Sequence, residues 1–228
     1  MAEVSDITSS RNELEALRRE IDALDDSILA LVEKRVAAAI GIAELKSNGD
    51  TRLRLRPARE AAVIARLVGQ ARRSPEPLVR QVWREIMACC LDLQVHTELV
   101  LFAVRQPAAI VDAMRRRFGC AADMILADSP AAALQAARAR EAVAVIELDP
   151  ANDWWTALRT EKGIAIFDCL RDDLGAPIAV ALGRIAGEDL ASCPQVEIVE
   201  ADAIQNGAEL LASAAALRLV LLPSQAAA

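Results

Sequence analysis

The residues best suited to chemistry in this sequence are cations placed along an apolar helical stripe. Arg35 occupies a position in that stripe at which the other residues are apolar. A buried guanidinium without a partner costs several kcal/mol, so we expect an anion to contact Arg35. Lys46 follows 11 residues later, which is close to three helical turns, so the two side chains share a face about 16 Å apart. The spacing predicts a site that holds a small dianion between two cations.

The stripe itself predicts a long helix. Its apolar residues recur at alternating spacings of three and four, which is typical of a coiled-coil seam; they are Leu14, Leu17, Ile21, Leu24, Ile28, Leu31, Ala38, Ile42 and Leu45. Ser10 and Glu13 form a capping box, and Ser47-Asn48-Gly49 supplies a stop, so we expect a helix over 11–47. Such a helix, about 55 Å long, cannot cover its own seam. We expect a second copy of the chain to cover it, in a homodimer.

A dimer also explains a third cation. Arg18 has the same heptad position as Lys46 but lies four heptads earlier, about 42 Å away along one helix. In an antiparallel dimer, Arg18 of one chain would lie beside Arg35 and Lys46 of the other. The anion site is therefore expected to be shared between two chains and complete only in the dimer.

Two shorter helices are predicted next, over 57–72 and 74–97, each opened by a proline. The first begins with Arg56, Arg59 and Glu60, and the second presents Cys90 and Gln94 one turn apart on one face. Taken singly, each of these residues has an ordinary explanation. The charges suit a solvated surface, the thiol suits a small core position, and the glutamine suits the polar edge of a helix.

Together with Arg35, however, these residues resemble a known family. "LEALRREIDALDDSILALVEKRVAAAIGIAELK", "RPAREAAVIARL" and "WREIMACCLDLQ" look like the all-helical class of chorismate mutase, particularly the form fused to prephenate dehydratase. The resemblance covers residues 11–97. It implies an all-α, three-helix, intertwined homodimer in which each active site borrows one arginine from the partner.

The resemblance also implies roles for the site residues. Arg18 would be the borrowed arginine, and Arg35 its carboxylate-binding companion from the same chain. Lys46 and Gln94 would donate hydrogen bonds to the ether oxygen of the breaking bond. Glu60 would hold the ring hydroxyl.

Three further residues are assigned in the same way. Arg59 would lie beside Glu60. Arg56 stands where the family can have an aspartate, and Cys90 stands where it can have a serine. The second departure implies a weaker polar contact to the ring carboxylate.

The implied reaction suits this composition. Rearrangement of chorismate to prephenate is unimolecular and needs no nucleophile, metal or cofactor; the enzyme holds the compact conformer of the dicarboxylate and stabilises negative charge on the ether oxygen. The chain has a single histidine, His96, and five cysteines without a Cys-x-x-Cys pair, so it signals neither a zinc site nor disulfides. We expect free, buried thiols, no metal and no cofactor.

The bulk composition limits the partners and the location. With 54% hydrophobic residues the chain is globular, and its net charge of -7 argues against nucleic acid as a partner. Residues 1–98 are nearly neutral, and residues 99–228 carry most of the net negative charge. We find neither a signal peptide nor an apolar run of about 18 residues, so we expect a cytoplasmic protein that does not enter membranes.

From residue 99 the pattern changes. Short apolar runs alternate with Ala/Arg-rich segments, which predicts an α/β domain with a mixed or partly parallel sheet; the runs are "LVLFAV", "ADMILA", "AVAVIEL", "GIAIFD", "PIAVALG" and "RLVLLP". The intervening segments "PAAIVDAMRRRF" and "PAAALQAARARE" are the expected helices. No glycine-rich nucleotide motif is present. Trp154 and Trp155 suit either packing or a pocket wall.

The sequence therefore predicts a multi-domain protein, with a chorismate mutase-like helical domain over 1–98 and an α/β domain over 99–228. The second domain faintly resembles the early part of prephenate dehydratase, with "FG" at 118–119 and "AVAVIELDPAND", but it lacks that family's catalytic Thr-Arg-Phe. A degenerate dehydratase-like or regulatory domain and an unrelated α/β module both remain open. Besides a mutase acting on chorismate, the alternatives are an isochorismate-pyruvate lyase and a non-catalytic partner protein or sensor with an aromatic amino-acid effector.

Overall fold

The chain folds into two compact units, Met1–Asn48 and Gly49–Ala228. The structure, a computed structural model, describes residues 2–45, 55–138, 142–161, 163–185, 187–191 and 193–223. The expected class is confirmed: a long helical N-terminal region precedes an α/β region whose mixed sheet includes parallel strands.

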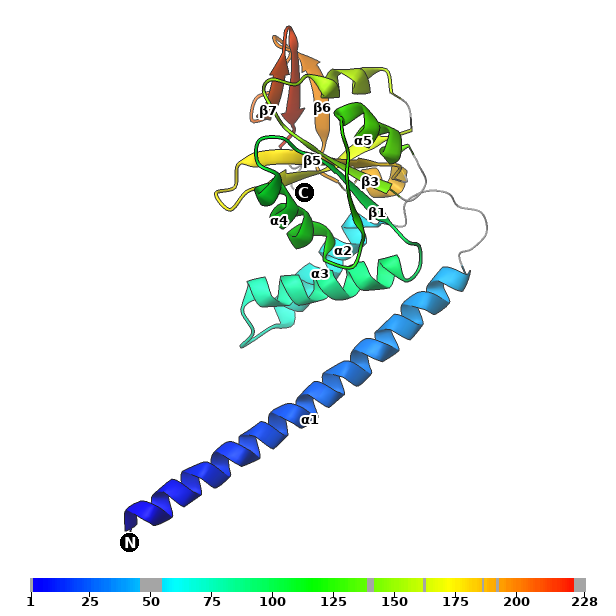
Figure 1. The fold of residues 1–228 in the computed structure, drawn as a ribbon. Helices are drawn as coiled ribbons and strands as arrows, with labels where there is room; N and C mark the ends of the chain where they lie inside the picture. Colours follow the sequence, from blue (N-terminus) through cyan, green and yellow to red (C-terminus); the bar gives the residue numbers. More distant parts are fainter. Residues whose placement is uncertain are drawn as a thin grey trace. The chain divides into compact units, whose positions relative to one another are not determined.

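The first unit is one helix, α1 (Ala2–Leu45), drawn in blue in Figure 1. The expected start at residue 11 is wrong, because the helix runs through the Ser10–Glu13 capping box to Ala2. No glycine or proline interrupts residues 2–10, so the capping signal competes with an unbroken helical segment. The large apolar residues of the seam are exposed to between 47% and 84% along α1: Leu14, Leu17, Ile21, Leu24, Ile28, Leu31, Ile42 and Leu45.

The second unit begins with a pair of helices, α2 (Pro57–Gln70) and α3 (Glu76–Asp92), which pack on each other. Pro57 opens α2 as expected. The expected extension of α3 to residue 97 is wrong, since the helix ends at Asp92. The Asp92 carboxylate accepts a hydrogen bond from the Thr97 backbone N–H at 3.3 Å, and the chain enters the sheet directly afterwards.

The larger sheet has five strands in the order β2-β1-β3-β5-β4. The sheet is mixed: β1 is parallel to both β2 and β3, whereas β5 is antiparallel to β3 and β4. The strands are β1 (Glu98–Phe102), β2 (Met124–Leu126), β3 (Ala142–Glu147), β4 (Ala165–Arg171) and β5 (Pro177–Gly183). Helix α4 (Pro107–Phe118) joins β1 to β2, and α5 (Pro130–Ala137) joins β2 to β3.

A smaller antiparallel sheet has the strand order β6-β8-β7. Its strands are β6 (Val196–Glu200), β7 (Glu209–Ala214) and β8 (Leu217–Leu221). Only β8 is predicted from the sequence. A 3-10 helix, η1 (Trp154–Arg159), follows β3, and a single turn, α6 (Gly187–Leu190), follows β5.

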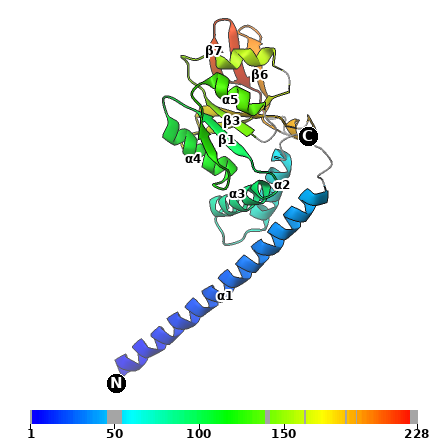
Figure 2. The same ribbon diagram turned by 45° about the vertical axis from the view of Figure 1, so that its right-hand side comes forward.

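The five-stranded sheet separates two hydrophobic cores, because alternate residues of each strand point to opposite faces. One core contains Leu99 and Val143 with Phe118 of α4, and Leu91 of α3 packs against it. The other contains Val100 and Ala144 with residues of α5, η1 and β8. Figures 1 and 2 show α4 and α5 on either side of the strands. Helices α2 and α3 therefore pack on the α4 side of the sheet.

The two tryptophans belong to the second core. Trp154 and Trp155 are 8% and 1% exposed, so the packing role is confirmed. The indole Nε1–H of Trp154 donates to the backbone oxygen of Glu147 at 3.2 Å. Trp155 Nε1 is buried and has no hydrogen-bond partner among the described residues.

Glu147, the last residue of β3, is a buried carboxylate with only 2% of its surface exposed. It accepts hydrogen bonds from three successive backbone N–H groups in the loop between β1 and α4: Val104 at 2.6 Å, Arg105 at 2.9 Å and Gln106 at 3.1 Å. These donors precede the first turn of α4, where a negative charge is favoured. The Glu147 side chain therefore fixes the loop that joins β1 to α4.

Candidate functional site

The candidate site residues are divided between the two units. In α1, Arg18 donates to Glu15 at 2.8 Å along the helix surface, and Arg35 follows 17 residues later. Lys46 lies outside the described residues. The rise of a helix places Arg18 and Arg35 about 26 Å apart, so one small molecule cannot contact both in the same chain.

In the second unit, the start of α2 brings three candidates together. Arg56 is the N-cap residue of α2, and its Nε lies 3.8 Å from Oδ2 of Asp189 in α6. Arg59 is exposed on the first turn, and Glu60 beside it is partly buried. Proline at the first turn gives this segment its helical start. The two neighbours Arg59 and Glu60 are thus placed by α2 as the sequence predicts.

The two candidates from the third predicted helix are Cys90 and Gln94. Cys90 is 4% exposed, which fits a small core residue. Gln94 lies beyond the end of α3, and its backbone N–H donates to Leu91 at 3.0 Å. The helix ends between the two residues, although the backbone N–H of Val95 still donates to Leu91 at 3.0 Å, so the i, i+4 pair stays a prediction. Neither residue lines the cavity beside Glu60.

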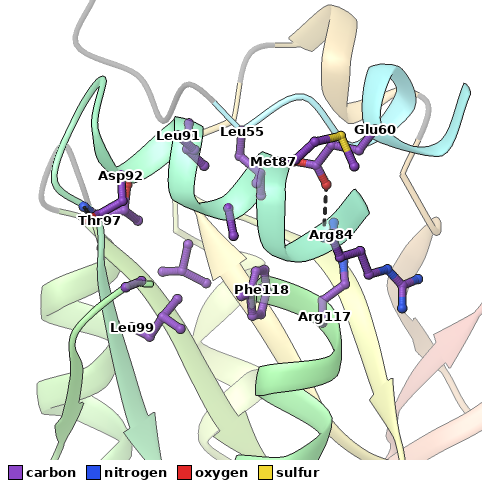
Figure 3. A pocket seen from close by; sticks show the side chains of 13 residues that line it. Leu55, Glu60, Arg84, Met87, Leu91, Asp92, Thr97, Leu99, Arg117 and Phe118 are labelled. Atoms are coloured by element: carbon purple, nitrogen blue, oxygen red, sulfur yellow. Dashed lines mark hydrogen bonds and ion pairs between the residues drawn. The ribbon is translucent and has the colours of Figure 1, made fainter. Parts of the chain in front are cut away.

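Glu60 lies at the edge of a small cavity between α2, α3, α4 and the sheet (Figure 3). The cavity volume is about 30 Å³, above the roughly 10–15 Å³ that a single water molecule needs. Its walls are mainly apolar, and its polar groups are Glu60, Arg84, Asp92, Thr97 and Arg117. A ring dicarboxylate does not fit into this volume.

The strongest interaction at the cavity comes from Arg117 of α4. Its Nη1 donates to Glu60 Oε2 at 3.0 Å, and its Nε donates to Oδ2 of Asp168 in β4. All three side chains are largely buried, with exposed fractions of 22% for Glu60, 16% for Arg117 and 19% for Asp168. The Arg117 guanidinium also lies 5.0 Å from the centre of the Phe118 ring. One arginine thus connects α2, α4 and β4.

The electrostatics of this cluster follow from burial and from the charges around it. Burial raises the pKa of Glu60 above its ordinary value, although Arg117 and, more weakly, Arg84 act in the opposite direction. Burial works against the charge of Arg117, but Asp168 and Glu60 outweigh it and raise the pKa of the guanidinium. Burial, together with Arg117, lowers the pKa of Arg84. The Cys193 thiol beside this cluster has a pKa raised by burial to about 11 and is neutral.

The roles of Arg117 and Asp168 are not predicted from the sequence. Arg117 is the last of three consecutive arginines in an alanine-rich helix, and its neighbour Arg116 pairs with the exposed Asp173. Asp168 is the only charge in the otherwise apolar run "AIFDCL". A lone acid in such a strand is the signal that a buried cation lies nearby.

The described residues contain no group of three or more histidine, cysteine or acidic side chains able to hold a metal ion. The five cysteines are free thiols. The expectation that they are buried is wrong for Cys89 and Cys120, which are exposed. Within the described residues, no helix combines the length and the apolar character needed to cross a membrane.

Comparison with known proteins gives a consistent result for the helical region. Residues 17–95 match the family model described as chorismate mutase type II. A bifunctional chorismate mutase/prephenate dehydratase of Pseudomonas aeruginosa is 34% identical over 92 residues, which is 38% of this chain and 25% of the relative. A protein of the same description from Aquifex aeolicus is 31% identical over 87 residues, 36% of this chain and 24% of the relative.

This chain thus spans about a quarter of the length of the curated relatives that it matches. No solved structure gives a significant match. The resemblance of the helical region is confirmed by the family model and by both relatives.

Proposed function

Because residues 17–95 contain a chorismate mutase type II domain, we propose that the protein is a chorismate mutase that converts chorismate to prephenate. The match of this segment is the observation that carries the proposal. It includes Arg18, Arg35, the Arg59-Glu60 pair and Gln94. The reaction belongs to the biosynthesis of phenylalanine and tyrosine.

In the proposed mechanism the residues bind and orient the substrate, without forming a covalent bond to it. Arg18 and Arg35 hold the two carboxylates in the compact conformer, since guanidinium groups bind carboxylates through two parallel hydrogen bonds. Lys46 and Gln94 donate to the ether oxygen, where negative charge grows in the transition state. Glu60 accepts from the ring hydroxyl. Arg56, Arg59 and Cys90 complete the substrate-binding set.

We propose that the active enzyme is a homodimer with two shared sites. The exposed apolar stripe of α1 supports this proposal, since a soluble chain rarely leaves so many large apolar side chains in water. The 17-residue separation of Arg18 and Arg35 supports it as well, because only an antiparallel pair of helices brings the two side chains to one substrate.

We assign the catalytic function to residues 1–98 and leave residues 99–228 as a degenerate dehydratase-like or regulatory domain. A cytoplasmic location belongs to the same proposal. An aromatic amino-acid effector is the second candidate function, and one observation favours it. A cavity of about 370 Å³ is lined by apolar residues of η1, β4 and β6 together with Arg159 and Gln195. Its volume lies within the range of small-molecule sites, which begin at about 300 Å³, and its exposed lining is more polar than apolar.

Loss of chorismate absorbance with the purified, full-length protein tests the main proposal. We expect first-order conversion well above the uncatalysed rate. A folded dimer without such activity would refute the mutase function. Release of pyruvate from isochorismate, faster than conversion of chorismate, would identify the protein as an isochorismate-pyruvate lyase instead; Glu60 favours the mutase.

Calorimetry with phenylalanine, tyrosine and tryptophan tests the effector proposal separately. We expect one of the three to bind with a stoichiometry of one per chain. Substitution of Ile166→Trp should abolish that binding, because Ile166 lines the cavity and the larger indole would take up part of its volume. Absence of binding by all three amino acids would remove the effector from the proposal.

A further inference from the structure

Arg117 joins the α/β fold to the carboxylate of Glu60, a proposed catalytic residue. It donates to Glu60 Oε2 at 3.0 Å from a position outside the segment that matches the mutase family (Figure 3). Its second partner, Asp168, belongs to β4 of the five-stranded sheet. The contact therefore joins the first turn of α2 to β4, an edge strand of the five-stranded sheet.

The contact is selective among three consecutive arginines. The side chain of Arg115 is exposed, and that of Arg116 pairs with Asp173 at the surface. Only Arg117 is turned inward, where 16% of its side chain remains exposed. A guanidinium at such a position needs compensating charge, and two carboxylates supply it. The orientation of Arg117 thus depends on Asp168 and Glu60 together.

Glu60 depends on Arg117 in turn. Burial disfavours the ionised carboxylate, and Asp168 acts in the same direction. The opposing charges are Arg117 of α4 and, more weakly, Arg84 of α3, while Cys193 beside them is a neutral thiol. Removal of Arg117 would leave a partly buried acid with a nearby negative charge, which is the setting that raises a carboxyl pKa most.

The geometry of the pair leaves Glu60 able to act. Arg117 contacts only one of the two carboxylate oxygens, Oε2. Within the part of the chain that the structure describes, Oε1 accepts no hydrogen bond, so it can take a further donor such as a substrate hydroxyl. The side chain is 22% exposed, so it is accessible at its outer edge.

From these contacts we infer that Arg117 is a positioning residue for Glu60: it orients the carboxylate through Oε2 and keeps it ionised for contact with the substrate. This inference rests on the proposed mutase function. It assigns the α/β fold a specific task in that reaction, namely to complete the site from outside the family segment. If Arg117 instead blocked the access of substrate to Glu60, its removal would raise kcat/KM.

The experiment compares pH profiles of kcat/KM for the full-length protein and four variants. Arg117→Ala should lower kcat/KM at pH 7 by about 10- to 100-fold, mainly through KM, because Glu60 loses its orientation and part of its charge. The acid limb of its profile should move to higher pH by about one unit. Arg117→Lys should restore part of the activity, since it keeps the charge without the two-pronged geometry. Arg116→Ala, the matched control on the same helix, should behave like the unmodified protein.

The variant Asp168→Asn should shift the acid limb of the pH profile in the direction opposite to Arg117→Ala. It removes a negative charge that raises the pKa of Glu60 and retains Arg117, so the acid limb should move to lower pH. A residue that serves only to stabilise the fold would not produce opposite shifts in the two variants. Asp168→Asn also keeps the inference testable if Arg117→Ala does not fold.

The outcomes separate this inference from the proposed function. If the unmodified protein has no mutase activity, the function fails, and carbon NMR titration of the Glu60 carboxyl still tests whether Arg117→Ala raises its pKa. An unchanged pKa in that titration overturns the inference. So does a variant Arg117→Ala with the acid limb and kcat/KM of the unmodified protein. An increase in kcat/KM in that variant overturns it in favour of the blocking arrangement.

Discussion

Arg171 of β4 and Glu209 of β7 form a two-pronged ion pair that joins the two sheets, with Nη1–Oε1 at 2.9 Å and Nη2–Oε2 at 2.5 Å. The hydrogen bonds from Arg171 lower the pKa of Glu209 below its ordinary value of 4.5. Both side chains are about a third or more exposed, so solvent screens part of the attraction. The pair therefore contributes specific geometry and a modest stabilisation.

A double-mutant cycle of Arg171→Ala and Glu209→Ala should give a coupling energy of about 0.5–1 kcal/mol in urea unfolding at pH 7. Because the folded pKa of Glu209 is lowered, the stabilisation is present above the unfolded pKa and disappears as the pH falls through the folded one. The coupling should thus decline as the pH falls below the ordinary pKa of a glutamate and vanish once Glu209 is protonated in the folded protein. The single contact of Arg159 with Glu200, at 3.4 Å between half-exposed side chains, is the control and should give a smaller value. Equal coupling for both pairs would contradict the geometric argument.

Substitution of Glu147→Gln should lower the free energy of unfolding by about 3 kcal/mol. The carboxylate accepts from three backbone N–H groups, and an amide offers one oxygen and directs its own N–H₂ group at the remaining donors. Urea unfolding measures the loss. Glu197→Gln on the exposed face of β6 is the matched control and should change stability by less than about 0.5 kcal/mol. A loss of stability at Glu147 as small as that of the control would show that the loop keeps its conformation without these hydrogen bonds.

Gly119→Ala should destabilise the protein by about 3 kcal/mol or more. Gly119 follows α4 with φ of +74°, and an added Cβ would lie 2.7 Å from the Cβ of Ala88 in α3. Gly163→Ala is the control, since its φ is +95° but an added Cβ meets no atom within 4 Å. This variant should lose only about 1–2 kcal/mol of stability, which is the strain of placing alanine at a positive φ. Thermal unfolding of both variants separates the two effects, and equal losses would exclude a tight α3–α4 contact.

Arg35→Ala should lower kcat/KM for chorismate by about 100- to 1000-fold or more, because the variant loses a preorganised cation in the site. The dimer should stay folded, as judged by light scattering and circular dichroism. Lys34→Ala, the neighbouring cation, should retain activity. If Arg35→Ala remains active, the arginine has a structural role in the seam of α1.

Mixing two inactive variants tests the shared site directly. Arg18→Ala and Arg35→Ala chains, unfolded together and refolded in equal amounts, should recover about a quarter of the activity of the unmodified protein. Half of the dimers then contain one chain of each kind, and each such dimer has one intact site out of two. Each variant refolded alone is the control. A mixture as inactive as its components would place both arginines in the same chain's site or outside any site.

Local sequence signals predict much of the fold. The segment "PAAIVDAMRRRF" predicts α4 with its observed limits, because proline opens it and Gly119 ends it. The sequence does not predict β6 and β7, whose segments "VEIVE" and "ELLASA" mix apolar residues with charges and small residues. These two strands flank β8 in the small sheet, where a strand needs only one apolar face.

The candidate site is predictable only in part, for a physical reason. Arg59 and Glu60 are recognised because the family pattern is local to α2. The partner of Glu60 is not, since Arg117 lies 57 residues away and meets it only through the packing of α4 beside α3. No local sequence pattern predicts that contact.

The buried carboxylate of Glu147 has a consequence for what the α/β fold can bind. In the larger sheet, β1 lies between β2 and β3. The chain runs from β1 through α4 to β2 on one side of β1, and then through α5 to β3 on its other side, so the connections diverge between β1 and β3. In open α/β sheets, the crevice at such a divergence, outside the carboxyl ends of the strands, is where ligands enter. Here Glu147, at the carboxyl end of β3, already occupies the backbone donors at that place. The fold carries its own anion there, in the position that a phosphate or carboxylate from solution would otherwise take.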